Sequence, residues 1–101
     1  NVMAEENDPE SVLNFYRKLI ALRNASRTLQ YGDYRPLWTE HPQIFAYERT
    51  LDGEMYTVVC NMSGVEAVLP ESSTGVISLS NKKDRNEIVL FPYEARVIRS
   101  M

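Results

Sequence analysis

The sequence predicts a mainly β fold: an antiparallel β-sandwich of about six to eight short strands preceded by one amphipathic α-helix. Helical periodicity is confined to one stretch near the start. The rest of the chain alternates short apolar runs with turns rich in Gly, Pro, Asn and Asp. The connections between those runs span roughly two to six residues, which leaves no room for the crossovers that parallel strands need. The 101 residues are enough for one domain with its own core.

The helix is predicted over residues 9–24. Asp8 can cap its first turn, and Pro9 suits the first helical position because its missing N–H costs nothing there. Arg23 projects within the apolar arc at the last turn, where the negative end of the helix dipole favours a positive charge. This position indicates a C-terminal cap whose aliphatic stem is buried. The apolar face is wide and fills about half of the helical wheel. It consists of Val12, Leu13, Phe15, Tyr16, Leu19, Ile20 and Leu22.

The segments after the helix are rich in aromatic and β-branched residues and are separated by polar turns. Residues 31–36 predict a turn, because Gly32 and Pro36 punctuate them. Asp52-Gly53 lies between two long runs and predicts a tight hairpin with a type I′ turn. Extended segments are predicted at 37–39, 43–51, 54–62, 65–69, 76–79, 87–91 and 94–99.

Composition and charge exclude several partners. The formal net charge is −3 and the basic residues are scattered, so no surface for nucleic acid is expected. The longest uncharged apolar runs, such as 55–60, have five or six residues, fewer than the roughly 20 that span a membrane. The first residues have neither the basic start nor the apolar core of a secretory signal. The single cysteine, Cys60, cannot form an internal disulfide and indicates a reducing compartment, so we expect a cytoplasmic protein.

Residue types that carry common enzyme chemistry are sparse. One histidine, His41, and one cysteine do not suffice for a cluster of such ligands, so no metal or cofactor is expected. The four glycines are isolated at predicted turns, which excludes a phosphate-binding loop. Glycoside hydrolysis needs two paired carboxylates. The acidic residues instead fit a leader, a helix cap, a turn and exposed strand faces, as at Glu66, Glu87 and Glu94, so no catalytic residue is assigned.

Three aromatic residues, Tyr31, Tyr34 and Trp38, fall close together in a loop-rich stretch. Such rings can form a platform that stacks on a sugar. They can equally cover an interface while their polar ends stay hydrated. The sequence leaves both interpretations open, with these three residues as the candidate substrate-binding set.

Four segments, 8–23, 42–49, 59–63 and 90–97, follow one another in a distinctive order, and residues 18–23 spell Lys-Leu-Ile-Ala-Leu-Arg. In this order they resemble the end of an α-glucosidase of the oligo-1,6-glucosidase-like branch of the α-amylase superfamily (glycoside hydrolase family thirteen). In that branch, a tyrosine-rich helix ending in Lys-Leu-Ile-x-Leu-Arg closes the catalytic barrel and leads into a C-terminal β-domain. The resemblance covers nearly the whole chain.

This resemblance implies a division of the chain into a leader at 1–8, the last barrel helix at 9–24 and the C-terminal β-domain at 25–101. The catalytic carboxylates of such retaining enzymes lie on barrel strands that precede the helix, so this chain alone is expected to be inactive. Its partner is the catalytic barrel of the same polypeptide, which acts on an α-glucoside. The resemblance implies a barrel interface at Val12, Phe15, Tyr16, Leu19, Leu22 and Arg23.

Several alternatives remain open. The parent enzyme can be an isomalto-oligosaccharide or glucan hydrolase, a trehalose-6-phosphate hydrolase or a sucrose isomerase, because barrel loops decide between them. The chain can also be an independent carbohydrate-binding or protein-interaction module, although such a module has no need of a helix with so wide an apolar face. Without its barrel, we expect the chain to self-associate through this exposed helix.

Overall fold

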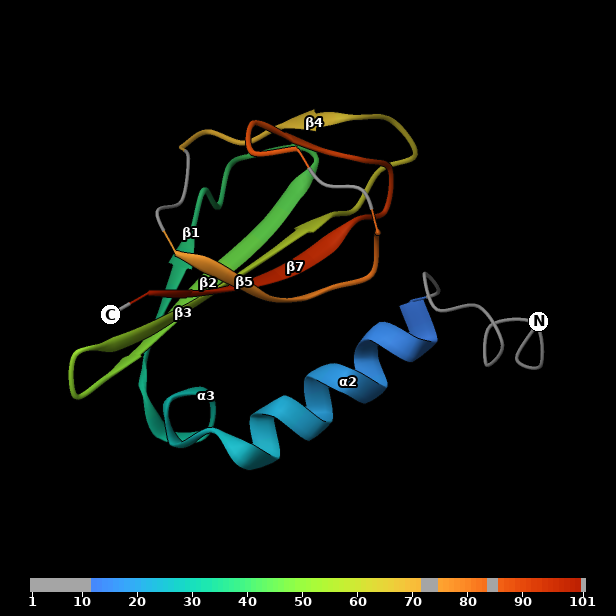
Figure 1. Cartoon of the computed structure of the whole chain (residues 1–101). Helices are drawn as coiled ribbons and strands as arrows, with labels where there is room; N and C mark the ends of the chain where they lie inside the picture. Colours follow the sequence, from blue (N-terminus) through green and yellow to red (C-terminus); the bar gives the residue numbers. More distant parts are fainter. Residues whose placement is uncertain (1–11, 72–74, 84–85, 101) are drawn as a thin grey trace.

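The computed structural model describes residues 12–71, 75–83 and 86–100, and Figure 1 labels its helices and strands. Within these residues two helices come first, α2 (Val12–Ala25) and α3 (Arg27–Tyr31). The strands that follow are β1 (Asp33–Leu37), β2 (Ile44–Leu51), β3 (Glu54–Asn61), β4 (Ala67–Val68), β5 (Val76–Ser80), β6 (Val89–Leu90) and β7 (Ala95–Ser100). None of the helices described is long and apolar enough to cross a membrane.

The strands form one five-stranded sheet in the order β1-β2-β3-β7-β5 and one small sheet that pairs β4 with β6. Every pair of neighbours in both sheets is antiparallel. The prediction of a mainly β, antiparallel fold preceded by an amphipathic helix is therefore confirmed.

The five-stranded sheet lies between the helices on one side and the small sheet on the other (Figure 1). Successive residues of a strand point to opposite faces, and the central strand β3 uses both of them. Val58 packs on the helix side and Val59 on the small-sheet side. The helix-side core contains Phe15, Leu29, Tyr56, Val58, Ala95 and Val97. The opposite core contains Ile44, Ala46, Val59, Ala67, Leu69, Leu90 and Ile98.

The tight hairpin between β2 and β3 has the predicted position. Leu51 pairs with Glu54, and the two residues between them have positive φ, 51° at Asp52 and 83° at Gly53. Two successive residues in the left-handed region are the signature of a type I′ turn, whose twist matches that of the flanking strands.

We expect Gly53→Val to lower the free energy of unfolding by about 1–2 kcal/mol, the usual cost of a β-branched residue at positive φ. No atom lies within 4 Å of a Cβ added at this position, so the cost comes from backbone strain and not from a clash. Urea unfolding measures the change. A variant as stable as the parent chain would contradict the turn geometry.

The first helix agrees with the prediction over its described part. It runs from Val12 to Ala25, whereas the predicted range was 9–24. The predicted cap at Asp8 and the first helical position at Pro9 lie outside the described residues.

The segment between the first helix and the hairpin differs from the prediction. A second helix, α3, occupies residues 27–31, because the Ser26 side chain accepts a hydrogen bond from the Leu29 N–H at 3.1 Å and caps it. The turn predicted over 31–36 is mostly strand β1. Pro36 is compatible with that strand because β1 is at the edge of the sheet. The predicted extended piece at 37–39 ends early, since Trp38 has a φ of 48°.

The later strands are shorter than predicted at two places, and one acidic side chain is buried instead of exposed. Only Ala67–Val68 of the predicted 65–69 and Val89–Leu90 of the predicted 87–91 are strand. Glu94 was expected on an exposed face, but its side chain is 0% exposed and forms an ion pair with Arg96 at 2.6 Å.

This ion pair holds the 86–91 segment over the sheet. Glu94 Oε1 accepts a hydrogen bond from the Phe91 N–H at 2.8 Å, and Arg96 Nη1 donates to the Asn86 carbonyl at 2.9 Å. A buried charge is tolerated only when it is paired and hydrogen-bonded, which this arrangement provides. The segment that covers the small-sheet core is thereby fixed to β7.

Candidate functional site

Three carboxylates of the described residues are engaged in contacts that link elements of the fold. Besides Glu94, Glu48 pairs with Arg35 at 2.6 Å across β1 and β2. Glu54 accepts hydrogen bonds from the Thr28 hydroxyl and the Arg99 guanidinium, and these two donors lower the pKa of its carboxyl group. Among the residues that the structure describes, no three His, Cys, Asp or Glu side chains are placed to hold a metal ion.

The three aromatic candidates for sugar binding do not share one surface. Tyr31 is exposed at the end of α3. Tyr34 packs on the helix side, with its ring centroid 5.2 Å from that of Tyr47 and the Arg49 guanidinium 5.9 Å from its centre. Trp38 is half-buried and packs against the core on the opposite side, under the small sheet. In a regular strand Trp38 would lie on the same face as Tyr34, because every second residue points the same way. The left-handed backbone at Trp38 breaks this alternation.

The residues predicted to face a barrel are divided between two environments. Phe15 is only 4% exposed and packs against the sheet, and Leu19 and Leu22 are half-buried against the same core. Tyr16 is 56% exposed, and Arg23 is exposed too. The side chain of Val12 lies outside the described part of the chain.

The exposed residues of α2 form a stripe. Tyr16, Ile20 and Arg23 are spaced by four and three residues, so they lie on one face of the helix. Ile20 is 58% exposed, so together with Tyr16 it leaves apolar side-chain surface uncovered on this face. The stripe lies on the flank of α2, beside the face that packs on the sheet through Phe15.

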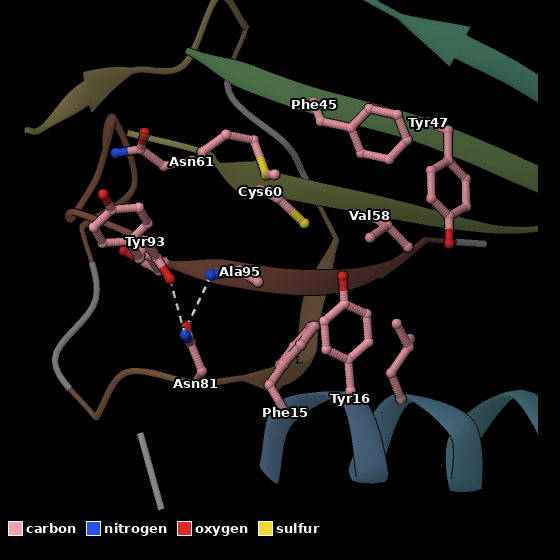
Figure 2. A pocket seen from close by; sticks show the side chains of 13 residues that line it. Phe15, Tyr16, Phe45, Tyr47, Val58, Cys60, Asn61, Asn81, Tyr93 and Ala95 are labelled. Carbon is pink, nitrogen blue, oxygen red and sulfur yellow. Dashed lines mark hydrogen bonds between the residues drawn. The ribbon is translucent and has the colours of Figure 1, made fainter. Parts of the chain in front are cut away.

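A cavity of about 470 Å³ lies between α2 and the helix-side face of the sheet, and we call it the α2 groove. Figure 2 shows side chains from the helix and from β2, β3 and β7 around it. Its lining is almost entirely apolar or aromatic. The lining residues are Phe15, Tyr16, Leu19, Phe45, Tyr47, Val58, Cys60, Asn61, Met62, Asn81, Tyr93, Glu94 and Ala95.

The two asparagine side chains that line the α2 groove are hydrogen-bonded within the chain. Asn81 donates to the Tyr93 carbonyl at 2.9 Å and accepts from the Ala95 N–H at 2.8 Å (Figure 2). Asn61 donates to the Val65 carbonyl at 2.7 Å and accepts from the Ser63 N–H at 3.0 Å.

The Cys60 thiol also lines the groove, and burial raises its pKa to about 11. Burial likewise raises the pKa of the Tyr47 hydroxyl. Both groups are therefore kept in their neutral forms at neutral pH. The groove is suited to contact with another apolar surface and not to acid-base chemistry.

The sheet side of this groove was not predicted from the sequence. Phe45, Tyr47 and Arg49 alternate along β2, so strand periodicity could have placed them on one face. Met62 continues the same alternation after Val58 and Cys60, whereas Tyr93 lies in a turn before β7 and follows no such pattern. Only the folded chain brings them to the same groove as Tyr16.

No protein-family model matches the chain, but it is similar over nearly its whole length to longer proteins. It is 39% identical over 105 residues to a palatinase from Erwinia rhapontici, in an alignment that covers 94% of this chain and 19% of the palatinase. It is 37% identical over 108 residues to an oligo-1,6-glucosidase from Halalkalibacterium halodurans, covering 96% of this chain and 19% of that protein. The chain thus spans about a fifth of the length of the curated relatives it matches.

The fold also occurs within a solved structure. The crystal structure of trehalose-6-phosphate hydrolase from Bacillus licheniformis superposes on this chain with a TM-score of 0.78 at 27% identity. The match covers 98% of this chain and 20% of that protein. Both the sequence and the arrangement of α2 against the sheet are therefore found as one part of much larger chains.

Proposed function

Since this chain is related over nearly its whole length to oligo-1,6-glucosidase-like enzymes of the α-amylase superfamily, we propose that it is the non-catalytic C-terminal part of such an α-glucosidase. The observation that carries the proposal is the coverage: 96% of this chain aligns with only 19% of the oligo-1,6-glucosidase from Halalkalibacterium halodurans. The part of the protein that binds and cleaves an α-glucoside then lies in the other four fifths.

In this proposal the chain comprises a leader at 1–8, the last helix of the catalytic barrel at 9–24 and a β-domain at 25–101. Phe15 is buried against the sheet, which supports the proposal that the helix packs on the β-domain as well as on the barrel. The exposed stripe of Tyr16, Ile20 and Arg23 is the face we assign to the barrel. Phe15 and Leu22 then hold the helix on the β-domain.

The bond that the whole enzyme cleaves is not encoded in this part of it. Proteins named palatinase, oligo-1,6-glucosidase and trehalose-6-phosphate hydrolase all contain a similar segment. The chemistry of a retaining glycosidase would come from two barrel carboxylates, one a nucleophile and the other a general acid and base. An independent sugar-binding module is not favoured, because Tyr34 and Trp38 pack on opposite sides of the sheet.

We expect the 101-residue chain alone to hydrolyse no 4-nitrophenyl α-glucoside, because Glu48, Glu54 and Glu94 are engaged in structural ion pairs. The assay compares the purified chain with the whole enzyme at equal molar concentration. Turnover that copurifies with the chain and is lost in Glu54→Gln would contradict the proposal.

We also expect the isolated chain to self-associate, because the exposed stripe of α2 has lost its partner. Sedimentation at increasing concentration should show a rising mean mass, and Ile20→Glu should restore a monomer. Ile20 is a better position for this test than Leu19, which is half-buried against the core, where a charge would disturb the fold itself. If the isolated chain without the substitution stays monomeric at every concentration, this expectation is refuted.

A further inference from the structure

We propose that His41 makes the turn between β1 and β2 sensitive to pH: a proton on its Nδ1 atom opens this turn and frees Trp38 from the core. The turn comprises residues 38–43 and joins the edge strand of the large sheet to its neighbour. Such a switch would operate whatever reaction the whole protein performs.

The imidazole of His41 closes the turn as a hydrogen-bond acceptor. Its Nδ1 atom accepts from the Gln43 N–H at 3.0 Å and from the Ile44 N–H at 3.1 Å. A ring nitrogen accepts only when it carries no proton, so these two bonds require the form of the ring whose proton is on Nε2. A proton on Nδ1 turns the acceptor into a donor that faces two other donors, and the turn loses both bonds.

The same chain contains this arrangement with an acceptor that does not titrate. Asn86 Oδ1 accepts from the Ile88 N–H at 2.8 Å and from the Val89 N–H at 3.1 Å. In both turns the donors are the second and third residues after the acceptor. An amide oxygen keeps these bonds as the pH changes, whereas an imidazole ordinarily gains a proton between about pH 8 and pH 5. At His41 the same type of turn therefore depends on pH.

The backbone of Trp38 favours opening once the two bonds are lost. Its φ of 48° is in the left-handed region, which is unfavourable for a bulky aromatic residue, and its carbonyl accepts from the His41 N–H at 2.9 Å. Strained backbone of this kind persists only where the surrounding structure holds it. In the open turn Trp38 returns to an extended backbone, and its half-buried side chain leaves the core under the small sheet.

Opening of the turn also loosens the segment that follows β3. The Gln43 side-chain amide donates to the Ser63 hydroxyl and to the Glu66 carbonyl, both at 3.1 Å. The Gln43 carbonyl accepts from the Met62 N–H at 2.8 Å. Residues 63–66 lead into β4, so the small sheet loses part of its attachment to the large sheet when Gln43 moves.

The charges around the turn leave the response to His41. A cavity of about 370 Å³ beside the turn is lined from β1, β2 and the residue after β3, and among the described residues that line it His41 is the one titratable group. Glu40 in the turn and Glu66 after β3 are both exposed, and Arg35 of β1 is paired with Glu48 of β2. Water and salt screen exposed charges, so the two hydrogen bonds to Nδ1 decide how the turn responds to a proton.

Fluorescence of Trp38 tests the proposal, because this is the one tryptophan of the 101-residue chain. The emission maximum is recorded between about pH 7.5 and pH 5, the range in which an imidazole titrates. We expect a reversible red shift as the pH falls, since the ring becomes exposed to water. His41→Asn is the matched control, because it supplies the acceptor found at Asn86, and its emission should not shift. His41→Ala, which removes the acceptor, should show the shifted emission already at pH 7.5.

Amide NMR of the unsubstituted chain gives a readout that needs no variant to fold. We expect the Gln43 and Ile44 amide resonances to shift with the same midpoint as the ring protons of His41. The Ile88 and Val89 amides, which are bonded to an asparagine, should not follow that midpoint. Gln43 and Ile44 amides that do not follow the ring would overturn the proposal, and so would the same pH profile of Trp38 emission in the unsubstituted chain and in His41→Asn.

Discussion

Replacing Arg96 with methionine is expected to lower the free energy of unfolding by about 3–5 kcal/mol, because it leaves the Glu94 carboxylate buried without its partner. The side chains of the two residues are 3% and 0% exposed, so water cannot replace the guanidinium. The substitution also removes the donor to the Asn86 carbonyl, which anchors the 86–91 segment. Urea unfolding of the isolated chain measures the loss.

The matched control is Arg35→Met, since Arg35 pairs with Glu48 at the same 2.6 Å but has a side chain that is 70% exposed. An exposed pair contributes little to stability, because water and salt screen the two charges. The double variant Glu94→Gln, Arg96→Met should recover part of the loss, because glutamine is neutral and keeps an acceptor for the Phe91 N–H. Equal unfolding midpoints for Arg96→Met and Arg35→Met would contradict this role of the buried pair.

Phe15→Ala is expected to destabilise the isolated chain by about 3–5 kcal/mol, whereas the neighbouring Tyr16→Ala should change stability by less than about 0.5 kcal/mol. The reason is that Phe15 is 4% exposed within the helix-side core and Tyr16 is 56% exposed. In the whole enzyme the difference in destabilisation between the two variants should be smaller, because Tyr16 gains a partner there.

Thermal and urea unfolding of the two variants in both contexts provide the comparison. A Phe15→Ala chain with parental stability would mean that α2 is not docked on the β-domain. A Tyr16→Ala substitution that is as mild in the whole enzyme as in the isolated chain would mean that the stripe has no partner in the barrel.

Local sequence signals predicted the elements whose structure depends on neighbours in the chain. The hairpin follows from Asp52-Gly53, which needs only the preference of two residues for positive φ. The helix follows from its apolar period. By contrast, α3 has five residues, too few for a period, and its signal was the cap at Ser26.

The features that the sequence did not predict depend on contacts between distant segments. Glu94 directly precedes β7 and Arg96 lies two residues further on, and this spacing on a shared face was a signal for an ion pair. Its burial, however, depends on the 86–91 segment folding over β7. The α2 groove likewise combines a helix, three strands and three segments beside strand ends, so no local pattern contains it.

The central claim, that this part of the enzyme stabilises the catalytic part without taking part in the chemistry, is tested most directly by kcat and thermal midpoint measured together. Each described carboxylate is changed to its amide in the whole enzyme, and turnover of 4-nitrophenyl α-glucoside is measured below the midpoint. We predict that kcat stays within about twofold throughout, while Glu94→Gln lowers the midpoint. A variant of this segment whose kcat falls by about 10³-fold or more at an unchanged midpoint would place a catalytic carboxylate here and contradict the account.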